Sequence, residues 1–296
     1  MAIPKVAAIH DLSGLGKCSL TAAIPILAAL GVQACPMPTA VLSNQTGFPS
    51  YTGQDLTAQL EGFAQAWKRL GVRLDGVYTG FLCNNRQIDF VSSFVRDFAE
   101  PGILVLIDPV LADNGQYYAL FDHNTCRAMS SLIRQATVIT PNLTEACFLT
   151  GRTAGDYAAL AAKPDPDIIL EMARTLSRSG PETVVISGIP AGEEIAILGY
   201  QSRKDEAVWV KNRRIGPGYS GTGDILASVL CGCLIRGKSL SYALEKAACL
   251  LERSVARAYE EGVDPNEGVA FEEYLYLLAE PPQERLEQRN HRKEAL

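Results

Sequence analysis

The chain has 296 residues, close to half of them apolar and about a fifth charged, which is enough apolar material for a substantial core. Its formal net charge of -6 gives no general electrostatic reason to bind nucleic acid or an anionic membrane. No apolar stretch is long enough to span a bilayer, and the run after Met1 is too brief for a secretion signal, so we expect a cytoplasmic globular protein.

Short apolar strands and amphipathic helices alternate through the first two thirds of the chain. The expected strands span residues 6–9, 32–41, 76–79, 103–107, 137–139 and 183–186, and the expected helices span 18–30, 56–70, 86–99, 124–134 and 168–179. Parallel strands need crossover connections. The alternation therefore predicts an α/β fold, a mostly parallel central sheet with helices on both faces.

The last third of the chain departs from this alternation. Residues 194–200 and 207–211 predict an antiparallel hairpin, and helices are expected over 222–235, 239–259 and 271–278. Residues 281–296 are rich in Arg, Glu and Gln and predict a charged tail after a single domain of residues 1–280. Ligands of open parallel sheets bind beyond the carboxyl ends of the strands, so polar residues at those ends are the candidates for a site.

The eight cysteines are spread through apolar segments of this pattern, which favours buried thiols over disulfides. The closest pair, Cys231 and Cys233, lies in an expected helix without a second pair or a nearby histidine. We therefore expect no cysteine metal centre there.

The most informative segment is Gly218-Tyr219-Ser220-Gly221-Thr222-Gly223-Asp224, which runs directly into an apolar helix. Glycines allow close backbone approach to a ligand, and the first amides of a helix lack intrahelical partners at its positive end. Gly221, Thr222 and Gly223 therefore predict an anion site. Beside a bound phosphate, Asp224 would take the proton of an attacking alcohol as general base. The alternative is that it serves only as a helix N-cap.

Oxygen-bearing side chains follow two of the expected strands. Asp108 and Asp113 come after residues 103–107, and Asn142 and Glu145 come after 137–139. Such hard oxygen ligands hold Mg2+ beside nucleotide phosphates, although a turn or a helix cap explains Asp108 or Asn142 better when either is taken alone. Their occurrence together with Asp224 favours phosphoryl transfer with Mg2+.

The segment from His10 to Lys17 is similar to a phosphate-binding P-loop only superficially. Asp11 stands where the Walker pattern needs glycine, and Cys18 stands where it needs Ser or Thr. A loop on the substrate side is the better interpretation. His10 is a candidate substrate contact, with an ordinary packing role as the alternative.

Taken together, these segments resemble the ribokinase-like superfamily and, within it, the pyridoxal, pyridoxine and pyridoxamine kinases. The resemblance covers nearly the whole chain and rests on Val41-Leu42-Ser43-Asn44-Gln45-Thr46-Gly47, Tyr78-Thr79-Gly80-Phe81, Asp108-Pro109-Val110-Leu111-Ala112-Asp113, Thr140-Pro141-Asn142-Leu143-Thr144-Glu145 and Gly221-Thr222-Gly223-Asp224. It implies a ribokinase-like fold and ATP-dependent phosphorylation of the 5'-hydroxymethyl group of a vitamin B6 vitamer. It also implies Mg2+, a possible K+ or Na+ ion, and a homodimer.

The resemblance implies roles for individual residues. Asp224 would be the catalytic base, and the backbone of Gly221 to Gly223 would receive the charge of the transferring γ-phosphate. Phe81 stands where many family members have tyrosine, which leaves the ring preference open. The other matched positions are Ser43, Thr46 and Phe81 for the substrate pocket, Asn142 and Ser187 for nucleotide phosphate, and Asp108, Asp113 and Glu145 for the metal.

Other functions are compatible with the same fold. The hydroxymethylpyrimidine kinases of thiamin synthesis typically resemble Gly-Thr-Gly-Cys where this chain has Asp224. Sugar and nucleoside kinases would favour more polar groups than the pocket around Phe81 offers. A vitamer-binding sensor or carrier without turnover is disfavoured because Asp224 and the glycines around it are both present.

Overall fold

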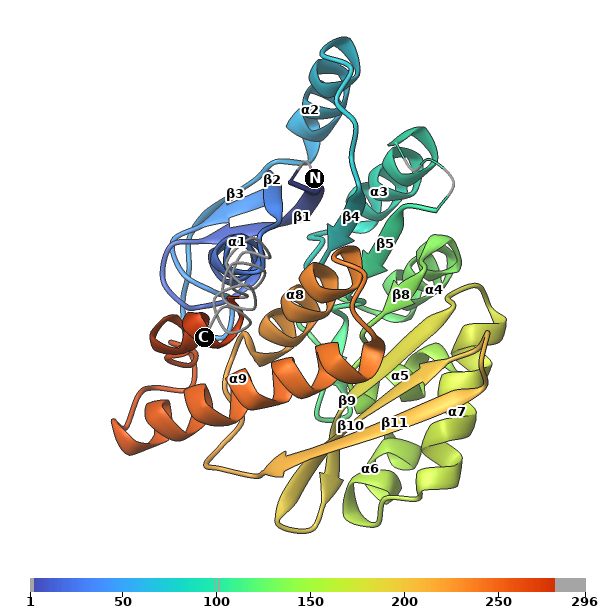
Figure 1. Ribbon diagram of the computed structural model, residues 1–296, viewed down its shortest axis with the longest axis vertical. Helices are drawn as coiled ribbons and strands as arrows, with labels where there is room; N and C mark the ends of the chain where they lie inside the picture. The colour runs from blue at the N-terminus through green and yellow to red at the C-terminus, as the bar shows by residue number, and fades with distance from the viewer. Residues whose placement is uncertain (1–2, 99, 101, 280–296) are drawn as a thin grey trace, which may run out of the picture.

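A nine-stranded sheet runs through the molecule, seen here in a computed structural model that describes residues 3–98, 100 and 102–279 (Figure 1). Its strand order is β11-β10-β9-β8-β5-β4-β1-β2-β3. The six strands from β9 to β2 are parallel, whereas β3 at one edge and β10 and β11 at the other side are antiparallel to the strands with which they pair. The strands are β1 (Lys5–Ser13), β2 (Gln33–Leu42), β3 (Gly53–Asp55), β4 (Gly76–Thr79), β5 (Leu104–Ile107), β8 (Val138–Ile139), β9 (Thr183–Ala191), β10 (Glu194–Gln201) and β11 (Glu206–Arg213), and a separate small hairpin pairs β6 (Ala112–Asp113) with β7 (Gln116–Tyr117).

Helices cover both faces of the sheet (Figure 1). Helices α2 to α7 contribute to the core on one face, and α1, α8 and α9 contribute to the core on the other. The helices are α1 (Ser19–Ala29), α2 (Thr57–Arg69), α3 (Asn85–Phe98), α4 (His123–Leu132), α5 (Leu143–Leu149), α6 (Ala154–Ala162), α7 (Pro166–Arg178), α8 (Thr222–Ile235) and α9 (Leu240–Glu260), with 3-10 turns at Ile133–Gln135 and Phe271–Leu277. The expected α/β architecture is confirmed.

The apolar strands supply side chains to both cores. In β9, Val184 and Ile186 pack in the core beneath α2 to α7, whereas Val185 packs in the core beneath α1, α8 and α9. Successive strand residues point to opposite faces, so a strand with helices on both sides must be apolar at every position. This explains why the central strands appear in the sequence as uninterrupted apolar runs.

Helix α8 is the most deeply placed helix near the site. Nine consecutive residues, Ile225 to Cys233, are buried. A helix that is apolar all round must be enclosed, and α8 packs between the sheet and helices α1 and α9. The position of its first turn is therefore fixed by the core.

Some boundaries differ from those expected. Helices α5 and α6, strand β3 and the β6–β7 hairpin are not predicted from the sequence, and the last expected helix is a 3-10 turn. Strand β1 continues to Ser13 through an irregularity between His10 and Leu12. Strand β9 continues to Ala191, past the expected end at residue 186. The charged tail expected at 281–296 lies outside the described residues.

All eight cysteines are free. Cys18, Cys126, Cys147, Cys231 and Cys233 are buried as expected, and Cys35 and Cys83 are half-buried, but Cys249 is exposed, so the prediction of a buried thiol is wrong there. Ala248 and Leu250 on either side of it are buried. Consecutive helix residues point in different directions, so an apolar run in the sequence can include one residue that faces solvent. Within the described residues, no helix combines the length and apolar character needed to cross a membrane.

Candidate active site

The parallel strands bring polar residues from distant parts of the sequence to one edge of the sheet. The amide of Asp108, after β5, donates to the Thr79 carbonyl at the end of β4 (2.8 Å). Thr140, after β8, donates its hydroxyl to Asp108 Oδ1 (3.0 Å). The amide of Ser187 in β9 donates to the carbonyl of Pro141 (3.0 Å). A set of hydrogen bonds thus links the carboxyl ends of β4, β5 and β8 to β9 at Ser187, and ligands of this fold class bind beyond the carboxyl ends of the strands.

The first turn of α8 is open to a ligand. Gly221 is its N-cap residue, with a positive φ of 79°, and a Cβ atom there would overlap the carbonyl oxygen of Lys17. Only glycine satisfies both conditions. No side chain of the described residues caps this helix, and a Cβ on Gly223 would meet open space. The amides of the first turn are therefore free to face an anion, as the sequence predicts.

Asp224 lies in the first turn of α8 and is half-buried. Burial raises the pKa of Asp224 to about 7, with a further contribution from the charge of Asp11, while the Ser19 amide opposes the shift. The fully buried Tyr78 hydroxyl lies 3.2 Å from the Asp224 carbonyl and 3.1 Å from Ser228 Oγ, which ties β4 to the first turns of α8. A carboxyl with a pKa near neutral is well matched to general-base work.

Asn142 and Glu145 form a capping box at the start of α5. The Glu145 amide donates to Asn142 Oδ1 (2.9 Å), and the Asn142 amide donates to Glu145 Oε2 (2.8 Å). Asn142 Nδ2 also donates to the Ala112 carbonyl (2.7 Å), and Glu145 Oε1 accepts from the Leu111 amide (2.9 Å). The capping alternative is therefore real for both residues, and their expected contacts with phosphate and metal stay predictions.

The three carboxylates expected at a metal site have different surroundings. Asp108 and Glu145 are 6% and 3% exposed. Burial and the negative charge of Glu145 raise the pKa of Asp108 well above its usual range. Burial also raises the pKa of Glu145. Asp113 is exposed, and its side chain accepts from the amide of Asn114 (2.8 Å). In the described part of the chain, no three His, Cys, Asp or Glu residues are grouped to hold a metal ion.

Ser187 lies at a β-bulge. Between the pairs Ala196–Ile189 and Leu198–Ile186, β9 has one more residue than β10, and Gly188 takes a positive φ of 70°. Ser187 is half-buried and forms an isolated bridge with Asn142. Bulges redirect side chains beside active sites. The bridge brings together the two positions expected to contact nucleotide phosphate.

The expected substrate side of the site is more open. Ser43 and Thr46 are exposed on the loop after β2, whereas Gln45 between them is buried and donates to the Asn266 carbonyl (3.1 Å). Phe81 is half-buried against Phe121, with ring centroids 5.7 Å apart. The structure thus presents Ser43, Thr46 and Phe81 at least partly to solvent, as substrate contacts require.

His10 is fully buried within β1, where the irregularity of the strand begins. Neither ring nitrogen makes a hydrogen bond of ordinary geometry to the described residues, and the ring packs edge-on against Tyr78 at 4.3 Å. Burial lowers the pKa of His10 to about 3, so the ring is neutral. A Cβ on Gly80 would overlap this ring, which explains the glycine in the Thr79-Gly80-Phe81 segment. Direct contact of His10 with substrate stays a prediction.

Two groups near the site carry no role in the sequence analysis. Asp11 lies within β1, where its charge raises the pKa of Asp224. The Tyr118 phenol follows β7, and burial and then the charges of four carboxylates, those of Glu145, Asp113, Asp108 and Asp224, raise its pKa. The tyrosine has no sequence signal beyond its closeness to Asp113. Asp11 does have a sequence signal, because it stands where a P-loop would have glycine.

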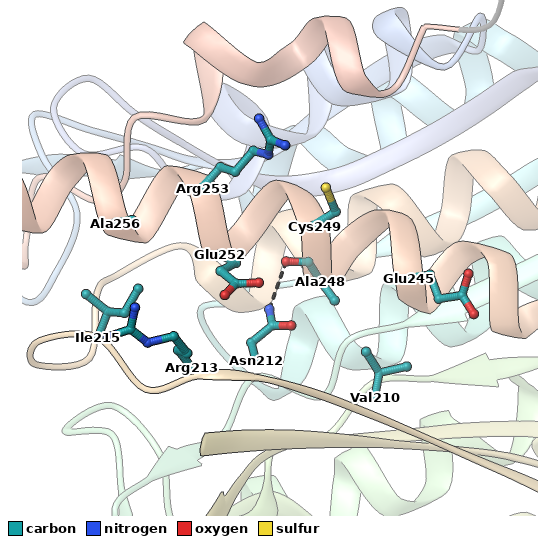
Figure 2. A pocket seen from close by; sticks show the side chains of 10 residues that line it. All are labelled: Val210, Asn212, Arg213, Ile215, Glu245, Ala248, Cys249, Glu252, Arg253 and Ala256. Carbon is teal, nitrogen blue, oxygen red and sulfur yellow. Dashed lines mark hydrogen bonds between the residues drawn. The ribbon is translucent and has the colours of Figure 1, made fainter. Parts of the chain in front are cut away.

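A cavity of about 560 Å³ lies between β11 and α9 (Figure 2). Apolar side chains and several polar ones line it, and Asn212 Nδ2 donates to the Ala248 carbonyl across it (2.8 Å). Its size is typical of small-ligand sites. The segment that leaves β11 lines the cavity at Ile215 and continues to the N-terminus of α8. The lining residues are Val210, Asn212, Arg213, Ile215, Glu245, Ala248, Cys249, Glu252, Arg253 and Ala256.

Known proteins are similar to this chain over most of its length. The model of the phosphomethylpyrimidine kinase family matches residues 18–269. A pyridoxal kinase of Dictyostelium discoideum is 29% identical over 264 residues, which are 84% of each chain. A pyridoxine/pyridoxal/pyridoxamine kinase of Bordetella avium is 27% identical over 79% of this chain and 78% of its own.

Solved structures agree with the sequence relatives. A candidate phosphomethylpyrimidine kinase of Bacteroides thetaiotaomicron, in a crystal form with pyridoxal, is 38% identical with a TM-score of 0.89, over 95% of this chain and 98% of its own. Pyridoxal kinase from Lactobacillus plantarum is 29% identical with a TM-score of 0.83, over 94% and 97% of the two chains. The chain belongs to the phosphomethylpyrimidine kinase family and, within it, to the pyridoxal kinases, which are phosphotransferases with an alcohol acceptor.

Proposed function

We propose that this protein transfers the γ-phosphate of ATP to the 5'-hydroxymethyl group of a vitamin B6 vitamer. The observation that carries the proposal is the uncapped first turn of α8, in which free backbone amides stand beside the carboxylate of Asp224. A relative that is 38% identical has a crystal form with pyridoxal, which supports a pyridine substrate. The partly exposed Ser43, Thr46 and Phe81 are the proposed substrate contacts.

The proposed reaction is a direct displacement. The vitamer hydroxyl oxygen attacks the γ-phosphorus as its proton passes to the Asp224 carboxylate, the bond from phosphorus to the bridging oxygen breaks, and ADP leaves. The amides of Gly221, Thr222 and Gly223 would hold the equatorial oxygens of the transferring group. With a pKa near 7, Asp224 is sufficiently deprotonated at neutral pH to accept this proton.

The cavity between β11 and α9 is the proposed site of the nucleotide base. Val210, Ile215 and Ala248 offer apolar contact to a flat ring, and Asn212 offers an amide. The chain leads directly from this cavity to the α8 N-terminus, so one nucleotide would place its base in the cavity and its phosphates at Gly221 to Gly223. Asn142 and Ser187 would lie near the phosphates at the bulge of β9.

The donor set at Asp108 and Glu145 fits a hydrated Mg2+ ion rather than a cage made by protein alone. Both carboxyls are buried with raised pKa values, and a cation beside them would relieve the repulsion of their charges. Mg2+ bound there would neutralise charge on the nucleotide phosphates. The monovalent cation and the homodimer implied by the family resemblance are further parts of the proposal.

The runner-up is phosphorylation of hydroxymethylpyrimidine, which the name of the matching family favours. Both functions are tested by offering pyridoxal, pyridoxine, pyridoxamine and hydroxymethylpyrimidine separately with ATP and Mg2+, and by identifying the products by mass spectrometry. We expect a B6 5'-phosphate that Asp224→Asn does not form. Preferential phosphorylation of hydroxymethylpyrimidine would move the protein to thiamin synthesis, and tight vitamer binding without transfer would indicate a sensor or carrier.

A further inference from the structure

A second carboxylate is buried next to Asp224 without a part in the proposed reaction. Asp11 is 3% exposed, and both of its oxygens are occupied. Ser13 Oγ donates to Oδ2 (2.7 Å), and Ser19 Oγ donates to Oδ1 (2.5 Å). A buried carboxylate costs free energy unless hydrogen bonds compensate, and here two serine hydroxyls provide them.

Ser19 connects this carboxylate to the catalytic one. It opens α1 with a positive φ of 48°, which is uncommon for any residue other than glycine and costs roughly 1 kcal/mol or more. In this conformation its hydroxyl binds Asp11, and its backbone amide is near enough to Asp224 to oppose the rise of the pKa of that carboxyl. Lys17 and Cys18, just before Ser19, lie against Gly221, so this strained residue stands between Asp11 and the first turn of α8.

The surrounding loop keeps Ser19 in place. The amides of Gly14 and Leu15 donate to the carbonyls of Leu42 (2.8 Å) and Ser43 (3.0 Å). The Lys17 carbonyl is so close to Gly221 that a Cβ atom at position 221 would overlap it. The loop before α1 is thus packed against both the substrate loop and the first turn of α8.

We propose that Asp11 and Ser19 are positioning residues for the general base: Asp11 holds Ser19 in its left-handed conformation, and Ser19 directs its amide at the Asp224 carboxylate. The inference rests on the proposed role of Asp224 and adds two residues that act through it. The negative charge of Asp11 also raises the proton affinity of Asp224.

Other titratable groups surround Asp224 as well. Cys18 before α1, Tyr78 in β4, Asp108 after β5 and Tyr118 after β7 each have a pKa that the charge of Asp224 raises. Replacing Asp11 leaves all four in place, so a change in the titration of Asp224 can be assigned to Asp11.

The test is the pH dependence of kcat/KM for the vitamer in Asp11→Asn. Asn keeps an oxygen that accepts from Ser19 Oγ, so this variant removes the charge and leaves the Ser19 amide in place. Loss of a like charge lowers the pKa of Asp224, so the acidic limb should move to lower pH by at least about half a unit. At the alkaline plateau kcat should fall, because a weaker base accepts the proton, while KM for ATP stays within about twofold. An acidic limb that stays at its wild-type pH would overturn the proposal.

Variants of Ser19 and Ser13 test whether Ser19 positions Asp224. Ser19→Ala should lower kcat by about tenfold, since it removes one hydrogen bond to a charged group and keeps the strained backbone. Ser19→Gly, which adopts a positive φ without strain, should retain several-fold more activity. Ser13→Ala is the matched control, because it removes the other hydroxyl from Asp11 and leaves the Ser19 amide in place. A loss from Ser13→Ala as large as that from Ser19→Ala contradicts the proposal, and so do equal losses from Ser19→Ala and Ser19→Gly.

A measurement without turnover separates this inference from the proposed function. The carboxyl carbon of Asp224 can be titrated by NMR in 13C-labelled wild type and Asp11→Asn, with Asp224→Asn to assign the signal. We expect a lower Asp224 pKa in Asp11→Asn, and equal values would refute the role of Asp11. Absence of phosphorylation in wild type would refute the proposed function, and the NMR titration would still decide this inference.

Discussion

Helices α5 and α8 both begin at the site edge of the sheet, and their first turns differ. At α5 the Asn142 side chain accepts a hydrogen bond from the Glu145 amide, and the Glu145 carboxylate accepts one from the Asn142 amide. At α8 the N-cap is Gly221, which has no side chain to offer. The α5 terminus is therefore closed by its own residues, and the α8 terminus is left for a ligand.

This difference shows what a polar residue near a helix start can mean. Asn142, Glu145 and Asp224 are all polar groups that suggest a phosphate or metal site in the sequence. Two of them satisfy backbone groups that would otherwise be unpaired, and one lies beside backbone groups that stay unpaired. The number of donors and acceptors left over, rather than residue type alone, distinguishes a site from a cap.

The largest effect is expected when the proposed base, Asp224, is removed from the open N-terminus of α8. Asp224→Asn keeps the volume of the side chain but cannot accept a proton, so kcat should fall by about a thousandfold. ATP affinity, measured by calorimetry, should stay near wild type because the amides of the first turn remain. A variant with near-normal turnover would show that Asp224 has a packing role and does not act as the base.

The two glycines of the open terminus should respond differently to substitution. Gly221→Ala places a Cβ against the Lys17 carbonyl at a positive φ, and we expect a loss of about 2–4 kcal/mol in the free energy of unfolding. Gly223→Val adds atoms where the structure has open space, so folding should be nearly unchanged while KM for ATP rises. Urea unfolding and steady-state kinetics on both variants separate the effects. Normal ATP kinetics in Gly223→Val would count against the anion site.

The buried carboxylates predict a pH dependence of stability in the ligand-free protein. Burial raises the pKa of Asp224 from 3.8 to about 7, so the folded state binds its proton more tightly than the unfolded state. Stability is therefore greatest below about pH 4 for this group and decreases as pH rises to about 7, by at most about 1.4 kcal/mol per unit. Asp108 and Glu145 shift in the same direction.

Urea midpoints measured from pH 4.5 to pH 8 check this prediction. Asp224→Asn should flatten the slope and be more stable than wild type at pH 8. Stability that increases with pH over this range would mean that these carboxylates are held in their charged form by partners. Addition of Mg2+ with ADP should reduce the slope, because cations favour the charged carboxylates.

Much of the fold is predictable because its signals are local. The central strands are continuous apolar runs between amphipathic helices, and this pattern needs no knowledge of distant residues. Helix α5 has seven residues directly after Pro141-Asn142, too few for a clear helical period. The extension of β9 past Ser187 depends on a bulge against β10, which is a property of two strands rather than one segment.

The candidate site is predictable only in part. Asp224 and the glycines lie in one short segment, so their combination is visible in the sequence. Asp11 and Tyr118 interact electrostatically with Asp224 only in the folded chain, because β1 and the segment after β7 lie far from α8 in the sequence. The hydrogen bonds of Glu145 to Leu111 and Ala112 likewise join segments more than thirty residues apart. Such contacts depend on strand order, which residue types alone do not determine.

Substitutions at the capped N-terminus of α5 give the smallest expected effect. They also check most directly whether this terminus differs from that of α8. Glu145→Ala leaves the amides of Leu111, Ala112 and Asn142 without their acceptor, so the free energy of unfolding should fall by about 2 kcal/mol even without metal or nucleotide. Glu145→Gln keeps one acceptor oxygen and should recover part of this loss. Asp113→Ala is the control, because Asp113 is exposed and bonds only to Asn114 among the described residues, and its cost should stay within about 0.5 kcal/mol.

A Glu145 that serves only a metal ion would behave differently. Removing a buried carboxylate with a raised pKa would then stabilise the metal-free protein above neutral pH, since the cost of its charge disappears. Urea unfolding of Glu145→Ala without Mg2+ at pH 8 separates the two roles by sign. A loss of stability assigns Glu145 to the α5 cap, and a gain would make the α5 terminus, like that of α8, a place where the fold gives up stability to bind a ligand.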